Sequence, residues 1–420
     1  MVTVTESAAL HDICDDRALD ARPARRLRRP SHLHLALIAL ALGGFAIGTT
    51  EFVTMGLLPQ IAQGVGISIP TAGHVVSAYA LGVVVGAPTI ATLAAKVPRK
   101  KLLLWLMVAF ALGNIGSALS PSYPVLLVAR FISGVPHGAY FGIGSLVAAS
   151  MVDKSRRTWA VSIMLAGLTV ANIIGVPVAT LIGQRAGWEW AYAVVGVVAL
   201  VTVVAVLAWV PTQSGDLYAS ARNELRSLRR LQVWLALGIG TVGFGGMFAT
   251  FSYIAPTMTH LAGFSDAVIP LVLMVYGIGM TLGTLTSGRL VAYGMMRGIT
   301  GALLAIAVVL ALFGFAAHSP WTAIPAVLAL GFVPSLLVPM LQTRLMDVAH
   351  EGQSLAAALN HATLNIANAF GAWLGGAVLA SGLGYEWPSR VGAVLALLGL
   401  AIAGVSAWVG RRAPMTPTAA

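Results

Sequence analysis

A carboxyl group and a guanidinium group each lie inside a long apolar stretch of this chain. Glu51 stands between Gly48 and Pro59 and is the only acid in such a stretch, and Arg130 is a basic residue in another. A charge at membrane depth costs several kcal/mol unless it is protonated, paired or hydrated, so such residues mark functional sites by default. A carboxyl whose surroundings decide whether it is neutral or ionised is suited to carrying a proton.

Glu51 and Arg130 occupy one level of the membrane. Glu51 lies eight residues before Pro59, and Arg130 lies seven residues into its own apolar stretch, which enters from the same side. At ~1.5 Å per residue, both are about 10–12 Å below that surface. We predict that Glu51 carries a proton and that Arg130 tunes it. A buried structural pair that only fixes two helices is the alternative.

A histidine follows on the same stretch as Arg130. His137 comes seven residues later, so it shares the helix face of Arg130 about two turns deeper. Because histidine titrates near neutral pH, this side chain could relay protons or bind substrate. A hydrogen bond between helices explains it equally well.

Other polar and aromatic side chains are predicted to line a substrate pocket. His361, Asn365 and Asn368 follow i, i+4, i+7 spacing and are expected to face a cavity at mid-membrane. Hydrogen bonding between helices is the competing explanation, and it is favoured for Asn172 and Asn368. A pocket for an amphipathic molecule is mostly apolar with few polar groups. The side chains expected to flank Glu51 are Thr50, Thr54 and Tyr79, and those expected to form an apolar wall are Phe141, Tyr253, Tyr276 and Met280.

Composition assigns all these residues to an integral membrane protein. The 420 residues are 58% hydrophobic and only 9% charged, whereas soluble domains carry about 25% charged residues. Twelve apolar runs approach the ~20 residues that a spanning helix needs. They cover 33–58, 71–95, 102–119, 123–148, 159–183, 190–210, 233–256, 267–292, 299–318, 321–343, 354–380 and 391–410. We therefore predict an all-α polytopic membrane protein.

The basic residues report topology. The net charge is +11, and 22 of the 25 Lys and Arg residues fall in the tails and connections of one side. Only Arg185 and Arg390 fall on the other side, and Arg130 lies within a span. Under the positive-inside rule, both termini are cytoplasmic and the chain crosses the cell inner membrane many times.

The two halves of the chain repeat each other. Tyr79, Gly82 and Gly86 match Tyr276, Gly279 and Gly283 at a shift of 197 residues. Two further matches, the segments from Leu168 and Leu364 and those from Gly187 and Gly384, show shifts of 196 and 197. Duplicated six-span units are known from secondary transporters. The expected parts are a disordered basic tail (1–32), a six-helix bundle (33–210), a cytoplasmic linker (211–232) with a surface-lying helix, a second bundle (233–410) and a tail (411–420).

Four segments resemble the major facilitator superfamily, and within it the bacterial drug:proton antiporters of the arabinose-efflux and chloramphenicol-efflux permease type. They run from Gly48 to Pro59, from Gly86 to Lys101, from Arg130 to Gly138 and from Gly167 to Pro177. The arginine that opens the third segment looks like a motif associated with proton coupling. The Gly- and Pro-rich fourth segment looks like a motif associated with antiporters. The resemblance covers residues 33–410.

This resemblance implies a major facilitator fold of two pseudo-symmetric six-helix bundles. It also implies export of a small amphipathic, drug-like molecule in exchange for protons by alternating access, with Glu51 as the proton carrier. A sugar or nucleoside efflux carrier, or an uncoupled facilitator of the same fold, is the alternative. The chain departs from the superfamily pattern at Lys96 and Pro98, where an Asp and a Gly are usual. Only a basic loop is therefore predicted there.

Enzyme motifs are absent from the sequence. There is no Gly-x-Ser-x-Gly, no His-Glu-x-x-His and no P-loop. We expect no catalytic residue, no metal and no cofactor. The expected partners are a small-molecule substrate, protons and membrane lipids, without nucleic acid, and the chain is expected to be a monomer.

Overall fold

A computed structural model describes residues 32–94, 96–153, 156–213, 229–291, 293–349 and 353–412. Its N-terminal half contains α1 (Leu33–Gly56), α2 (Leu58–Gly64), α3 (Ile69–Leu93), α4 (Arg99–Ala118), α5 (Tyr123–Gly134), α6 (His137–Ser150), α7 (Arg157–Val170), η2 (Ala171–Gly175), α8 (Val176–Ala186) and α9 (Trp188–Trp209). Its C-terminal half contains α11 (Leu231–Phe251), α12 (Ile254–His260), η4 (Asp266–Val268), α13 (Ile269–Val291), α14 (Met295–Ala316), α15 (Pro320–Ala349), α16 (Gln353–Ala380) and α17 (Trp387–Arg412).

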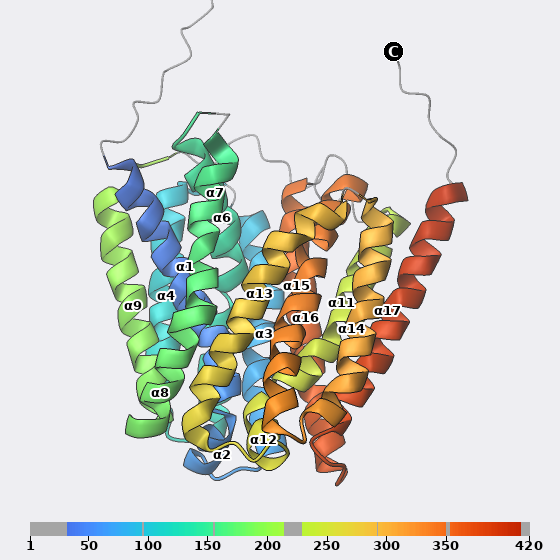
Figure 1. Cartoon of the computed structure of the whole chain (residues 1–420). Helices are drawn as coiled ribbons and strands as arrows, with labels where there is room; N and C mark the ends of the chain where they lie inside the picture. The colour runs from blue at the N-terminus through green and yellow to red at the C-terminus, as the bar shows by residue number, and fades with distance from the viewer. Residues whose placement is uncertain are drawn as a thin grey trace, which may run out of the picture.

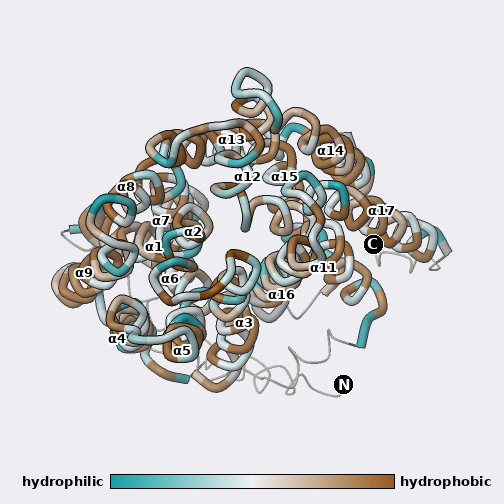
Figure 2. Tube along the Cα trace, turned by 90° about the horizontal axis from the view of Figure 1, so that it is seen from below, coloured by the Kyte–Doolittle hydropathy of each residue, from teal (hydrophilic) through white to brown (hydrophobic). Residues whose placement is uncertain are grey.

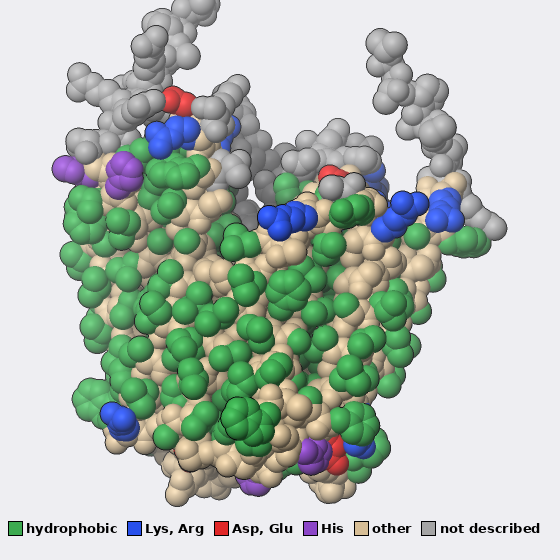
Figure 3. All heavy atoms as spheres, in the orientation of Figure 1, with side chains coloured by type: hydrophobic (Ala, Val, Ile, Leu, Met, Phe, Trp, Pro, Cys, Tyr) green, Lys and Arg blue, Asp and Glu red, His purple; other side chains and the backbone are tan. Residues whose placement is uncertain are grey.

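Twelve helical segments in the described residues are long and apolar enough to cross a membrane, which confirms the predicted number. They form two bundles of six, α1 to α9 and α11 to α17, which stand side by side (Figure 1). The helix α1 begins and α17 ends at one face of the molecule, which we call the terminal face; the other end is the opposite face (Figure 1). Apolar side chains cover the flank between these faces, and Lys and Arg gather mainly at the terminal face (Figure 3).

Two of the twelve spans are interrupted. The fourth divides into α5 and α6 at Val135 and Pro136, because proline supplies no backbone N–H and clashes with the preceding turn. The fifth contains the π-helical turn η2 between α7 and α8. Such turns are frequent at functional sites.

The repeat is visible in the packing within each bundle. A Cβ added to Gly82 of α3 would lie 2.1 Å from the Phe131 carbonyl oxygen of α5. A Cβ added to Gly279 of α13 would lie 2.4 Å from the Leu328 carbonyl oxygen of α15, and Phe131 and Leu328 are again 197 residues apart. These glycines therefore serve close helix packing inside each bundle.

The bundles touch mainly through α3 against α16 and through α13 against η2 and α8 (Figure 2). Three hydrogen bonds join them in the half near the opposite face. Ser77 Oγ donates to the Ala369 carbonyl at 2.9 Å, the Tyr253 hydroxyl donates to the Pro70 carbonyl at 3.4 Å, and Gln184 Nε2 donates to the Asp266 carbonyl at 2.8 Å. At the terminal face, a notch separates the two halves (Figure 3). The bundles are therefore closed together at the opposite face.

A basic residue in the first turn of α4 links this helix to α9 within the N-terminal bundle. Lys100 Nζ donates to the Leu207 carbonyl in the last turn of α9 at 2.9 Å, where a cation complements the helix dipole. The predicted tail residues 1–31, the linker residues 214–228 and residues 413–420 lie outside the described residues. The bundle and linker boundaries stay predictions.

Candidate functional site

Arg130 is fully buried on α5 and is held by α1. Its Nη1 donates to Thr50 Oγ1 at 2.9 Å, and its Nη2 donates to the Thr50 carbonyl at 3.2 Å. The guanidinium also lies over two aromatic rings, 4.4 Å from the Tyr79 centroid and 4.9 Å from the Tyr192 centroid. Cation–π contacts of this kind strengthen when the cation is removed from water. The arginine is thus fixed at the level of Glu51, as its place in the sequence predicts.

Glu51 is 9% exposed and lies between the two bundles. It interacts electrostatically with Arg130 and with the hydroxyls of Tyr79 and Tyr276, which belong to different bundles. Within the described part of the chain, Arg130 makes its hydrogen bonds to Thr50 and forms no direct ion pair with Glu51. The guanidinium therefore lies near the carboxyl but spends its hydrogen bonds on Thr50.

Two threonines expected to meet substrate are engaged elsewhere. Thr50 Oγ1 donates to Asn114 Oδ1 while it accepts from Arg130, and Thr54 Oγ1 lies 2.9 Å from the Tyr192 hydroxyl. Both threonines are fully buried. Their hydrogen bonds hold α1 against the neighbouring helices that carry Asn114, Arg130 and Tyr192. Spacing along one segment does not predict such partners.

A chain of rings leads from Arg130 to the second bundle. The Tyr79 hydroxyl lies 2.9 Å from His137 Nδ1. The His137 and His361 rings have centroids 6.4 Å apart. Phe141 stacks on His361 at 5.8 Å with an interplanar angle of 6°. His137 does not continue the helix of Arg130, because α5 ends at Gly134, but the two residues meet through Tyr79.

The apolar wall is built differently from the prediction. Tyr276 stacks on Phe251 at 3.7 Å, and Phe52 of α1 lies 6.3 Å from the Tyr276 ring, so this aromatic group joins the bundles next to Glu51. Tyr253 instead lies where the bundles meet near the opposite face, since its hydroxyl is 3.4 Å from the Pro70 carbonyl of α3 and 2.8 Å from the Ala372 carbonyl of α16. Met280 is half-buried against the core of the C-terminal bundle.

The helix α16 carries amide groups without partners. Asn365 Nδ2 donates to the His361 carbonyl at 3.0 Å, but its Oδ1 has no partner in the described structure. Neither side-chain polar atom of Asn360 or Asn368 has one, although these residues are 1% and 0% exposed. The expected interhelical bond of Asn368 is not formed, and Asn172 bonds to its own helix at the Leu168 carbonyl. A buried amide without a partner costs about 1–3 kcal/mol, so these atoms are suited to meeting water or a polar ligand.

Four residues that make these contacts were not predicted from the sequence. Asn114 is an amide in an apolar run, a signal that sequence reading could have used. Tyr192, Phe52 and Phe251 carry no such signal, because an aromatic residue in a spanning helix is ordinary. Only their positions in space bring them to Arg130 and Glu51.

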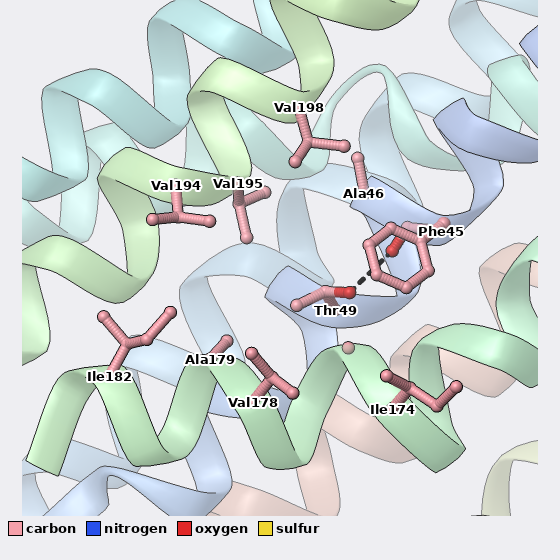
Figure 4. A pocket seen from close by; sticks show the side chains of 11 residues that line it. Phe45, Ala46, Thr49, Ile174, Val178, Ala179, Ile182, Val194, Val195 and Val198 are labelled. Carbon is pink, nitrogen blue, oxygen red and sulfur yellow. Dashed lines mark hydrogen bonds between the residues drawn. The ribbon is translucent and has the colours of Figure 1, made fainter.

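A separate apolar cavity of about 110 Å³ opens in the N-terminal bundle between α1, the fifth span and α9 (Figure 4). None of the predicted site residues lines it. Its one hydroxyl, on Thr49, donates to the Phe45 carbonyl at 2.8 Å (Figure 4). This cavity therefore lies apart from the seam between the bundles.

Comparison with known proteins decides the family. The model of the Major Facilitator Superfamily matches residues 40–360. The chain belongs to this superfamily. Among curated relatives, "Inner membrane transport protein YdhP" of Escherichia coli (strain K12) is 38% identical over 91% of this chain and 98% of its own length. The "Chloramphenicol resistance protein" of Streptomyces lividans is 32% identical over 87% of this chain and 95% of its own.

A solved structure supports the same fold. The structure of a bacterial homologue of the human lysosomal transporter Spinster, in an inward-facing and unoccupied conformation, aligns with a TM-score of 0.71 and 15% identity, over 92% of this chain and 99% of that one. This superfamily member is thus a multi-pass membrane transporter and not an enzyme, as its sequence predicts. Its described residues contain no group of three or more His, Cys, Asp or Glu side chains that could hold a metal ion.

Proposed function

We propose that the protein exports a small amphipathic molecule in exchange for protons, with Glu51 as the proton carrier. One observation carries the proposal: Glu51 is a buried acid at the seam of the two bundles, beside an arginine whose hydrogen bonds go to Thr50. Intramembrane ionisable residues of this kind mark proton or ion pathways in transporters.

The expected orientation decides which side of the membrane the described conformation opens to. Lys and Arg gather at the terminal face, which the positive-inside rule assigns to the cytoplasm of a cell inner membrane (Figure 3). The bundles are joined at the opposite face by Ser77, Tyr253 and Gln184. In this orientation, the described conformation receives its substrate from the cytoplasm.

The substrate is expected to bind on both sides of the seam. Phe52, Phe251 and Tyr276 offer aromatic surface, while the unpartnered amides of Asn365 and Asn368 on α16 offer hydrogen bonds. A largely apolar site with few polar groups suits an amphipathic molecule. The name of the Streptomyces lividans relative suggests chloramphenicol as the first compound to test.

Exchange follows if proton and substrate do not occupy the site together. With Glu51 ionised, the substrate binds from the terminal face, and the bundles rock to release it at the other side. A proton then neutralises Glu51, so that the empty carrier returns. Loss of that proton to the cytoplasm completes the cycle.

The test is gradient-driven accumulation of labelled chloramphenicol in proteoliposomes with an acidic interior. The wild type should accumulate the compound against its gradient, whereas Glu51→Gln should not. Asp266→Asn, which changes an exposed acid at the opposite face, should behave as the wild type. Glu51→Gln with unchanged accumulation and unchanged proton flux would refute the assignment.

A drug-susceptibility panel extends the test to other compounds. A strain that lacks its own exporters, expressing wild type or Glu51→Gln, should show resistance only with the wild type. Resistance that is equal for both would remove the basis for proton coupling and favour an uncoupled carrier.

A further inference from the structure

Three titratable side chains form a line from Glu51 toward the terminal face. Counted from the helix end at the opposite face, Glu51 lies five residues along α1 and Tyr79 ten along α3. His137 lies fourteen residues after Tyr123, and His361 lies nineteen before Ala380. At ~1.5 Å per residue, these depths are roughly 8, 15, 21 and 28 Å. The four residues therefore lie at successive depths, from Glu51 nearest the opposite face to His361 nearest the terminal face.

Neighbouring members of this line are in contact or close to it. Glu51 follows Thr50, which binds Arg130, and the Arg130 guanidinium lies 4.4 Å from the Tyr79 ring centroid. The Tyr79 hydroxyl lies 2.9 Å from His137 Nδ1. The His137 and His361 ring centroids are 6.4 Å apart, a gap that a ring rotation or one bridging water molecule closes. His361 is half-buried, whereas His137 is 3% exposed, so the line becomes more accessible at its far end.

We propose that Tyr79, His137 and His361 relay the proton of Glu51 to the terminal face. The inference rests on the proposed proton exchange and adds a route to it. In the first step, the Glu51 carboxyl gives its proton to the Tyr79 hydroxyl while that hydroxyl gives its own to His137 Nδ1. Glu51 is then a carboxylate, Tyr79 is unchanged, and His137 carries one positive charge. His137 next releases a proton from Nε2 toward His361, which passes it to water.

The groups around His137 favour onward transfer of the proton over its retention on one side chain. The titratable and charged groups that face His137 are Tyr79 of α3, Arg130 of α5 beyond the Tyr79 ring, and His361 of α16. Arg130 stabilises negative charge on the Tyr79 oxygen during the transfer, because its Cζ is 4.4 Å from the ring centroid. A charge on one histidine opposes a charge on the other, so the relay carries one proton at a time.

The helix α3 also supplies a control pair. His74 Nδ1 lies 2.9 Å from the Tyr123 hydroxyl, a His–Tyr contact between α3 and α5 with the length of the Tyr79–His137 contact. That pair is exposed near the opposite face and leads to no acid in a span. His74→Gln therefore removes a His–Tyr contact of the same length, at an exposed site, without touching the relay.

The experiment uses the full-length protein in proteoliposomes that contain a pH-sensitive dye, with chloramphenicol as the probe. For each variant, the rate of gradient-driven accumulation is divided by the rate of counterflow, the exchange of labelled for unlabelled compound without a gradient. We expect Tyr79→Phe, His137→Gln and His361→Gln to lower this ratio at least tenfold, and His74→Gln to leave it within twofold. Tyr79→Phe removes only a hydroxyl and keeps the test valid if a histidine variant misfolds.

A double variant tests whether the residues act in series. If the relay is already interrupted at one residue, removing a second residue has no further effect on proton transfer. Tyr79→Phe combined with His137→Gln should therefore lower the ratio no further than one change alone. Effects that multiply, or single variants with an unchanged ratio, would overturn the relay. Glu51→Gln without accumulation would in that case leave the proposed function standing. A wild type that moves no protons with chloramphenicol would overturn both.

Discussion

The two bundles share a packing plan and differ in chemistry. Tyr79 and Tyr276 are equivalent, yet the Tyr79 hydroxyl meets His137 Nδ1, whereas the Tyr276 hydroxyl donates to Met247 Sδ at 3.3 Å. A shift of 197 residues carries Glu51 to Phe248 and Arg130 to Val327, and both of these are buried apolar residues. The N-terminal bundle therefore carries the buried carboxyl and guanidinium, whereas the C-terminal bundle presents aromatic rings and neutral amides at the seam.

This difference indicates how a duplicated unit can specialise. The glycines that set helix separation were kept in both copies, with Gly82 against Phe131 and Gly279 against Leu328. A second buried carboxyl and guanidinium would add a desolvation cost of several kcal/mol for each ion. One charged bundle suffices if the other only presents a binding surface and moves as a rigid body.

The largest expected effect comes from removing the buried arginine of the N-terminal bundle. Arg130→Met removes two hydrogen bonds to Thr50 and two cation–π contacts. Each hydrogen bond to a charged group contributes about 1.5–3 kcal/mol, so the loss of both, together with the positive charge near Glu51, should lower gradient-driven chloramphenicol accumulation at least ~100-fold. The measurement is accumulation relative to counterflow, with thermal unfolding in detergent recorded for the same preparation.

Val327→Ala is the matched change in the second bundle. It opens a small cavity that should cost about 1–3 kcal/mol and lower the thermal midpoint, while the ratio of accumulation to counterflow stays unchanged. If Val327→Ala lowered that ratio as strongly as Arg130→Met, the division of labour between the bundles would be wrong.

Enlarging the packing glycines should destabilise the two bundles equally, and less than removing Arg130. An added methyl group at Gly82 or at Gly279 meets a backbone carbonyl at 2.1 or 2.4 Å, so each Gly→Ala change forces two helices apart. Overpacking of this kind costs about 1–3 kcal/mol. We expect both variants to lower the thermal midpoint by similar amounts. Gly142→Ala, where a Cβ meets open space, should leave it unchanged or raise it.

The packing symmetry, the twelve spans and the level of Glu51 and Arg130 could all be predicted from the sequence. Each depends on hydrophobic length, residue spacing or small side chains, which are properties of one segment at a time. The partner of Arg130 could not be predicted. Thr50 and Glu51 are adjacent in sequence, and only the rotation of α1 about its axis decides which of them faces the guanidinium.

The break after Gly134 shows the same limit. Spacing alone places His137 on the helix face of Arg130, but α5 ends before His137, and Tyr79 from α3 fills the space between them. Such contacts depend on three helices at once. Sequence reading therefore predicted that Arg130 and His137 lie near each other, but not the contacts through Tyr79 that connect them.

The smallest effect compares two equivalent asparagines. Asn172 donates to the Leu168 carbonyl at 2.9 Å, whereas Asn368 is fully buried with neither side-chain polar atom partnered in the described structure. A hydrogen bond contributes about 1 kcal/mol, and an unpartnered amide costs at least as much. Asn172→Leu should thus lower the thermal midpoint, and Asn368→Leu should leave it unchanged or raise it. If Asn368 serves the substrate, its variant should also need more chloramphenicol for half-maximal counterflow. Equal destabilisation by both changes would instead mean that Asn368 has a structural partner, and the amides of α16 would lose their place in the binding surface.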